Sequence, residues 1–427
     1  MRYDVSWRSL SEYLSHLESR GVVPNVASFV GATTVRIHVL GQVDRPPTPV
    51  EQARMEALVD VAMREGAMGV GASLIYAPAC YAPTAELVGL ASVAGRHGGL
   101  YIAHLRSEGV TLLEALEEHL HIARKGNMRA EVYHLKAAGR SYWHKLDEAI
   151  ARIEAARAEG LRVTADMYTY EAGSTGLDAA MPPWVQEGGH RARVARLRDP
   201  EIRARVVAEM QAPASGWENL FYETGADGML LGSFQTARLQ PLAGRTLAEV
   251  ARERGTSPAE TAIDLVIEDD TRVGTIYFMM DAENVRRQMA LPWVSFGSDS
   301  PSVAPDGPYR TKHLHPRAYG TFARVLGKYS RDERVLSLPA AVRRLSALPA
   351  TNLGLRDRGY LLPGMFADVV AFDPATVTDH ATYVRPHALA TGVQHVAING
   401  RLALRDGVPT GARPGRFVRG PGWNGHP

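Results

Sequence analysis

The strongest constraint on the fold is the regular alternation of short apolar runs with amphipathic segments along most of the chain. In the amphipathic segments, such as 111–125 and 145–160, apolar residues recur every three or four positions, as they do on one face of a helix. The second of these ends on Gly160, which is consistent with a helix C-cap. The order predicts a parallel sheet wrapped by helices, and its spacing of roughly thirty residues per unit is typical of a (β/α)8 barrel.

Six apolar segments have the length and composition of buried strands. They are 25–30, 69–75, 99–105, 130–135, 162–168 and 293–299. Residues 176–292 interrupt the rhythm with mostly helical sequence, in which 228–234 and 274–280 could add short strands. From about residue 357, short β-runs are separated by Gly, Pro and Asp-Gly turn signals. We therefore predict an α/β barrel over 1–345 with a helical insertion at about 176–292, and a small C-terminal β-sandwich portion over 346–427.

Charge and cysteine content narrow the classes of partner. Lys+Arg number 48 and Asp+Glu 46 in the 427 residues, which gives a formal net charge of +2 without a basic cluster, so nucleic acid and anionic membranes are poor candidates. The single cysteine excludes an intramolecular disulfide framework. The first residues do not read as a secretory signal, and no apolar run is long enough to span a bilayer. We expect a cytoplasmic protein that acts on a small molecule.

Two histidines end neighbouring strand segments. His104 lies at the end of 99–105, and His134 lies at the end of 130–135. Since the carboxyl ends of barrel strands meet at one face, the two imidazoles should point toward a common centre. Neutral imidazole is a common metal ligand, and a hydrolytic zinc site needs three protein ligands and an open position for water. The alternative is that each histidine ends its strand by chance.

Other side chains could contribute to such a site. Asp299 follows the last strand segment and could activate a metal-bound water, although its Asp-Ser-Pro-Ser context also suits a helix or turn cap. Arg317 carries the bidentate fork that matches a carboxylate, but it could also be an ordinary surface arginine. Tyr76 and Tyr168 could donate hydroxyls to a ligand or satisfy the core. Cys80, between two prolines, is a weak candidate for a ligand or nucleophile.

Longer motifs carry a resemblance to a known family. They are WRSLSEYLSHLE, NVASFVGATTVR, GASLIYAPACYAPTAEL, YIAHLRSEG, VYHLKAAG, TADMYTYEAGST, GSDS, HPRAYGTFARVLGKY and LLPGMFADVVAFDP. Almost from end to end, the chain resembles the D-aminoacylase (N-acyl-D-amino-acid deacylase) branch of the amidohydrolase superfamily. The block 315–329 is specific to that branch, whereas the motif PGMFADVVAFDP occurs across the wider superfamily.

The resemblance implies a (β/α)8 barrel with a small β-sandwich, a zinc ion, and hydrolysis of the amide of N-acylated D-amino acids. By their motifs, His104 and His134 resemble the two histidine zinc ligands of the family. Asp299 resembles its catalytic aspartate. The group that resembles the family's binding set for the substrate carboxylate comprises Lys136, Arg317, Tyr168 and Tyr76.

The sequence also departs from the family pattern. The family opens with a β-segment, a His-x-His motif that ends barrel strand one, and a further strand that carries a cysteine zinc ligand; the sequence has none of these ahead of its first strand segment, 25–30. Cys80 lies in a different motif, while Ala32 and Thr169 replace a usual His and Pro. The six strand segments would then be strands three to eight of the barrel. We expect either a shortened version of a longer deacylase or a truncated, inactive remnant; the retained site motifs favour the first.

Three functions remain open from the sequence. The first is a zinc hydrolase that releases a D-amino acid from its N-acyl form. The second is a cyclic-amide hydrolase of the dihydroorotase or hydantoinase kind, which typically bridges two metals with a carboxylated lysine on the fourth strand; the segment 69–75 contains no lysine. The third is a non-catalytic protein that keeps the scaffold for binding or assembly.

Overall fold

A six-stranded parallel sheet forms the centre of the protein in the computed structural model, which describes residues 5–213 and 215–425. Its strands run in the order β1-β2-β3-β4-β5-β9, and every neighbouring pair is parallel. The bounds are β1 Val30–Gly31, β2 Gly69–Ser73, β3 Leu100–His104, β4 Arg129–Val132, β5 Val163–Met167 and β9 Val294–Phe296. The parallel α/β architecture predicted from the alternating pattern is confirmed.

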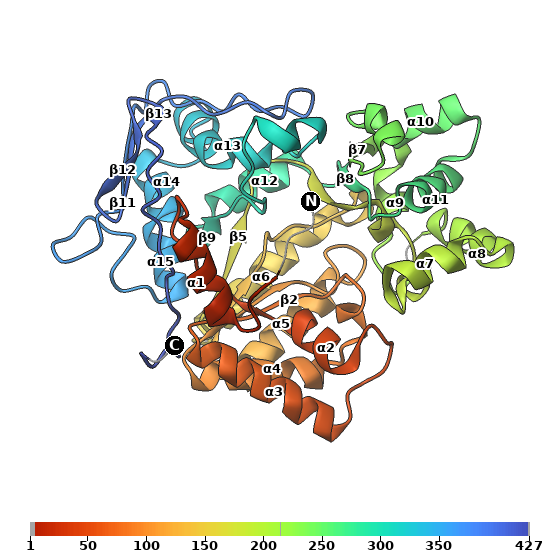
Figure 1. Ribbon diagram of the computed structural model, residues 1–427, viewed down its shortest axis with the longest axis horizontal. Helices are drawn as coiled ribbons and strands as arrows, with labels where there is room; N and C mark the ends of the chain where they lie inside the picture. The colour runs from red at the N-terminus through yellow and green to blue at the C-terminus, as the bar shows by residue number, and fades with distance from the viewer. Residues whose placement is uncertain (1–4, 214, 426–427) are drawn as a thin grey trace.

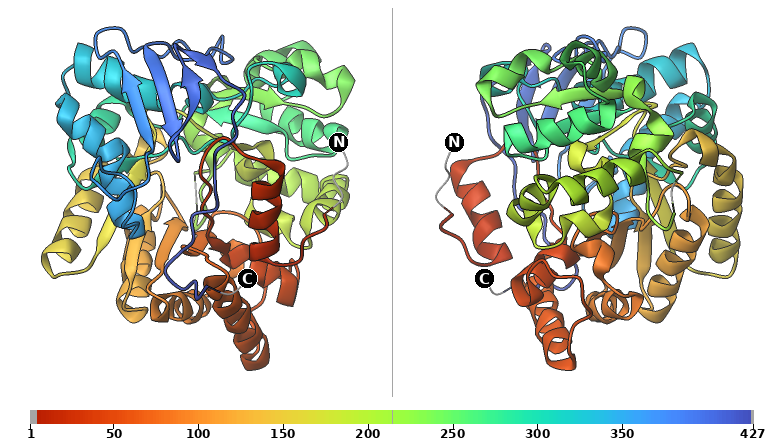
Figure 2. Two further views of the ribbon diagram at one scale, coloured as in Figure 1. Left: turned by 60° about the vertical axis from the view of Figure 1, so that its left-hand side comes forward. Right: turned by 90° about the vertical axis from the view of Figure 1, so that its right-hand side faces the viewer.

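The first predicted strand is largely wrong. Only Val30 of the segment 25–30 lies in β1, which is two residues long. Val26 instead forms an isolated parallel bridge with Phe417 near the other end of the chain. Figure 2 shows the C-terminal segment running beside α1 (Leu10–Arg20), where the Val26 amide donates to the Arg416 carbonyl at 2.9 Å.

Helices between the strands form a row in which each packs on the next, along one side of the sheet (Figure 1). Their bounds are α2 Ala32–Leu40, α3 Pro49–Arg64, α4 Thr84–Arg96, α5 Leu112–Lys125 and α6 Leu146–Ala158. The predicted helices 111–125 and 145–160 are confirmed as α5 and α6. In α5, the buried residues Leu112, Leu116 and Leu120 recur every four positions and form the apolar face. Gly160 follows α6 with φ +92°, a conformation that glycine adopts freely after a helix end.

Every described residue between β5 and β9 lies outside the parallel sheet. Most of this segment forms a separate lobe, at the right of Figure 1, around a three-stranded antiparallel sheet in the order β6-β8-β7. The strands are β6 Gly173–Gly176, β7 Met229–Ser233 and β8 Gly274–Tyr277, and the helices of the lobe are α7 Gly189–Leu197, α8 Pro200–Met210, α9 Leu220–Thr224, α10 Leu247–Arg254 and α11 Pro258–Asp269. The last helix of the segment, α12 Ala282–Ala290, lies near the centre of Figure 1 and bonds to the carbonyls of Leu135 and Trp143. The short segments 228–234 and 274–280 therefore do contain strands, but these strands pair with each other.

The end of the chain carries a small antiparallel sheet, as predicted. Its order is β10-β11-β12-β13, with bounds Val369–Phe372, Val393–Ile398, Arg401–Arg405 and Val408–Pro409. Before it come α13 Arg317–Arg324, a π-helical continuation Val325–Asp332, α14 Leu338–Leu345 and α15 Ala347–Leu353. The domain boundary at 345/346 stays a prediction. Among the described residues, no helix is both long and apolar enough to cross a membrane.

Candidate active site

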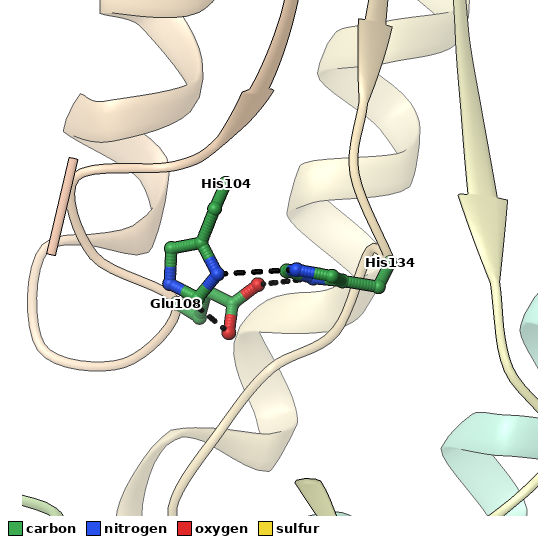
Figure 3. A group of neighbouring side chains, drawn as sticks. All are labelled: His104, Glu108 and His134. Atoms are coloured by element: carbon green, nitrogen blue, oxygen red, sulfur yellow. Dashed lines mark hydrogen bonds and ion pairs between the residues drawn. The ribbon is translucent and has the colours of Figure 1, made fainter. Parts of the chain in front are cut away.

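The two strand-end histidines lie side by side. His104 is the last residue of β3, and His134 follows β4 by two residues. Nδ1 of His104 lies 3.1 Å from Nε2 of His134 (Figure 3). His134 has φ +36°, an unusual conformation for a residue other than glycine, and its backbone N–H donates to Asp166 at 2.7 Å. The carboxyl ends of adjacent parallel strands thus bring both imidazoles to one point.

A third group, Glu108, completes this cluster. Its carboxylate lies 3.1 Å from Nδ1 of His134 and 3.7 Å from Nε2 of His104, and it accepts a hydrogen bond from the Lys136 ammonium at 2.7 Å. The three side chains are buried, and each offers a ligand atom within 4.8 Å of the others. Sequence reasoning missed Glu108, although the motif HLRSEG places it four residues after His104.

The electrostatics of the cluster suit a divalent cation. Burial lowers the pKa of His104 to about 3, so that its imidazole is neutral at neutral pH, and its Nε2 has no hydrogen-bond partner in the described chain. Burial alone would raise the pKa of Glu108, but its cationic and hydrogen-bonded neighbours lower it below its ordinary range. Two imidazoles and one carboxylate form a donor set that zinc takes in hydrolytic sites.

Arg317 and Tyr168 form a second group beside the cluster. Arg317 begins α13, and its buried guanidinium stacks on the Tyr168 ring at 4.5 Å from the centroid. His315 fixes the start of this helix by accepting the Arg317 backbone N–H at 3.0 Å. Nε of Arg317 has no hydrogen-bond partner in the described residues, and Nζ of Lys136 lies 5.5 Å from the centroid of the same Tyr168 ring. Two cations and a hydroxyl therefore converge where a carboxylate could bind.

Asp299 lies opposite, beyond the end of β9. Its Oδ2 is 2.8 Å from Arg317, its side chain is 42% exposed, and its φ of +46° again places a non-glycine residue in the left-handed region. Such strain is typical of functional positions. A cavity of about 130 Å³ is lined by all of the predicted site residues and by Glu108: Tyr76, His104, His134, Lys136, Tyr168, Asp299 and Arg317.

Two other features of the chain lie apart from this cluster. Burial raises the pKa of the Cys80 thiol to about 12, which leaves it protonated and unsuited to act as a ligand or nucleophile.

A larger cavity, of about 1250 Å³, lies at the opposite ends of the strands, where Met68, Gly99 and Arg129 line it. None of the predicted site residues line it. This agrees with the rule that the active sites of such barrels lie at the carboxyl ends of the strands.

Glu218, in the lobe, is a second carboxyl that sequence reasoning missed. It is 8% exposed, and its Oε2 accepts the backbone N–H of Glu108 at 3.0 Å. Burial, and then the charge of Glu108, raise the pKa of Glu218 from 4.5 to about 8. A neutral carboxyl at this position spares the site a second buried negative charge.

The raised pKa of Glu218 predicts a pH effect on stability. Between pH 4.5 and about 8 the folded chain holds a proton that the unfolded chain has released, so this group's stabilising contribution is present at low pH and is lost as the pH rises. The slope approaches about 1.4 kcal/mol per pH unit. Glu218→Gln removes this titration, so only the wild type loses stability from it as the pH rises. We therefore expect the unfolding free energy of the variant minus that of wild type, measured by denaturant titration, to increase with pH. Parallel curves would contradict the assignment.

Comparison with known proteins is consistent with this geometry. Residues 3–403 match the amidohydrolase family. An N-acyl-D-glutamate deacylase and a D-aminoacylase, both from Alcaligenes xylosoxydans xylosoxydans, are 33% and 34% identical over 96% of this chain, which spans 72% and 73% of their lengths. An N-acyl-D-aspartate deacylase of the same organism is 34% identical over 95% of this chain and 71% of its own.

Solved structures agree. The N-acyl-D-glutamate deacylase from Bordetella bronchiseptica, complexed with zinc and a phosphonate inhibitor that mimics the tetrahedral intermediate, matches with a TM-score of 0.79 and 31% identity, covering 96% of this chain and 75% of that one. A D-aminoacylase described with a binuclear metal centre matches at 0.78 and 33%, with the same coverage. The match to a dihydropyrimidinase, at 0.50 and 13% identity, concerns the fold alone. The chain belongs to the amidohydrolase family, within its group of N-acyl-D-amino-acid deacylases.

Proposed function

We propose that the protein is a zinc-dependent hydrolase that cleaves the amide bond of N-acyl-D-amino acids to a carboxylate and a D-amino acid. The observation that carries the proposal is the convergence of two imidazoles and a carboxylate next to a cationic pocket for a carboxylate. His104 and His134 would hold the metal, with Glu108 as the third ligand. The zinc in a structurally similar deacylase supports this choice of metal. A cytoplasmic location stays a prediction of the sequence.

The roles of the protein groups follow from their positions. When bound, zinc lowers the pKa of water and polarises a carbonyl oxygen. Asp299 accepts the proton of the attacking water and passes it to the leaving nitrogen. Arg317, Lys136 and Tyr168 hold the substrate carboxylate, and Tyr76 lines the same cavity. A carboxylate that binds Arg317 competes for the guanidinium that faces Asp299 at 2.8 Å, and so frees Asp299 for proton transfer.

The carboxylate anchor predicts the effect of Arg317→Met. Methionine keeps much of the apolar stem but removes the bidentate donor, so we expect KM for N-acetyl-D-methionine to rise about 100-fold, because a buried charged pair loses one partner. The exposed Arg401, on β12, provides the matched control, and its change to methionine should leave KM unaltered. An unchanged KM in Arg317→Met would remove the anchor role.

A panel of substrates separates the three functions. With zinc present, the protein should hydrolyse N-acetyl-D-methionine and leave N-acetyl-L-methionine and hydantoin essentially untouched. Preferred opening of hydantoin would favour the cyclic-amide hydrolases. Absence of turnover on every substrate would favour the non-catalytic scaffold and would overturn the proposal.

A further inference from the structure

We infer that the preferred substrates are N-acyl-D-amino acids with a bulky, uncharged apolar group, which occupies a second cavity beside the catalytic one. This inference rests on the proposed function and names its substrate class. Identities of 33%, 34% and 34% to deacylases named for glutamate, for D-amino acids in general and for aspartate do not distinguish these classes. The shape and charge of the cavities do.

The second cavity has the size of a small-molecule site, and large apolar and aromatic side chains line it together with polar ones. Its volume is about 430 Å³, whereas the catalytic cavity has about 130 Å³. Small-molecule sites commonly measure about 300–1,000 Å³, so the catalytic cavity alone holds little more than the reacting groups. Among the residues that line the second cavity are Leu74, Tyr81, Ala179, Met181, Trp184 and Trp217.

The two cavities adjoin. Ile75, Tyr76 and Glu218 line both of them, so a substituent that leaves the catalytic cavity past these side chains enters the second one. Tyr76 also lies against His104, with ring centroids 5.7 Å apart. A group attached to the reacting amide therefore has a short path into the second cavity.

Charge disfavours an anionic occupant. In the described chain, the one cation that lines the second cavity is Arg106, and its guanidinium is committed: it donates to Glu118 at 2.8 and 2.9 Å and to the carbonyls of Cys80 and Ala82 at 2.9 Å. The acidic residue Asp44 also lines it. A carboxylate placed there would lose its hydration without gaining a free cation, which is costly.

One competing cation lies just outside the two linings. Arg272 stacks on the ring of Tyr76 at 5.1 Å, and its Nε donates to both oxygens of Asp178 at 3.0 Å. Asp178 is buried and also pairs with Arg193. If a substrate carboxylate recruited Arg272 away from Asp178, acidic substrates would be favoured instead, and the experiment must distinguish this outcome.

Binding and turnover together test the inference in the full-length protein. Dissociation constants are measured by calorimetry, in zinc-free buffer where turnover is prevented, for N-octanoyl-D-alanine, N-acetyl-D-phenylalanine and N-acetyl-D-glutamate. We expect at least one of the apolar ligands to bind at least 30-fold more tightly than N-acetyl-D-glutamate, since each buried methylene is worth about 0.8 kcal/mol. The octanoyl arm reports on the acyl chain and the phenylalanine arm on the side chain.

Filling the second cavity supplies the matched variant. Ala179→Phe should reduce binding of the preferred apolar ligand at least tenfold, whereas the same change at the exposed Ala375 should not. Thermal unfolding of both variants establishes that they fold; should Ala179→Phe not fold, Trp217→Ala replaces it, with an expected loss of the same size. Binding of N-acetyl-D-glutamate that equals or exceeds that of the apolar ligands overturns the inference. If Arg272→Met then loses this binding of N-acetyl-D-glutamate, Arg272 is the residue that binds the side-chain carboxylate. Failure to hydrolyse any N-acyl-D-amino acid with zinc would instead overturn the proposed function, while the binding data still decide the inference.

Discussion

Replacing Asp299 with asparagine is expected to lower kcat for N-acetyl-D-methionine by about 10³-fold, because the amide keeps the size of the side chain but cannot accept a proton. Asp299 lies outside the cluster of His104, Glu108 and His134, and its Oδ2 faces Arg317. The zinc content of the variant should therefore equal that of wild type. Steady-state kinetics and elemental analysis of the same preparation measure both quantities.

Two results would contradict this role for Asp299. A kcat within a few-fold of wild type would show that another group moves the proton. A parallel loss of zinc would show that Asp299 is a ligand. The exposed Asp406, which lies 3.7 Å from His395 on the surface, offers a matched control, since its change to asparagine should alter neither quantity.

Glu108→Gln is expected to weaken zinc binding by more than about 100-fold, which is the upper range for groups that merely orient a ligand. The amide is a poorer ligand than the carboxylate, and it leaves the buried Lys136 without its partner at 2.7 Å. Lys136→Met breaks the same ion pair but keeps Glu108, so it provides the control. Zinc affinity is measured by competition with a chromogenic chelator.

The comparison of these two variants separates two roles of Glu108. If Glu108 is a ligand, only Glu108→Gln loses zinc, while Lys136→Met raises KM for the substrate. If Glu108 serves only to hold Lys136 and His134, the two variants should weaken zinc binding to a similar extent. That second result would leave the cluster with two protein ligands from the described chain.

The sequence predicted those parts of the fold that depend on local patterns. The segments 69–75, 99–105, 130–135 and 162–168 became central strands because continuous apolar runs bounded by helices are buried on both faces of a parallel sheet. The segment 25–30 looked similar, but its backbone bonds to residues 416 and 418 at the far end of the chain. Such a long-range contact leaves no trace in the local pattern.

The candidate site shows the same division. His104 and His134 could be located because each ends a strand, and parallel strands carry their ends to one face. Glu108 lies in a loop, where the spacing to the histidines says little about distance in space. Glu218 reaches Glu108 from the separate lobe, across 110 residues of sequence, and Trp184 and Trp217 meet there only because the lobe folds back over the strand ends. Proximity of this kind follows from tertiary structure alone.

We expect a single zinc site in this protein to hydrolyse N-acyl-D-amino acids. The most direct test is to measure zinc content and N-acetyl-methionine hydrolysis on one preparation, with the D and L enantiomers, before and after chelation and again after zinc is restored. We predict about one zinc per chain, together with D-selective hydrolysis that disappears on chelation and returns with zinc. Hydrolysis that is indifferent to zinc, or equally rapid for both enantiomers, would contradict the proposed function.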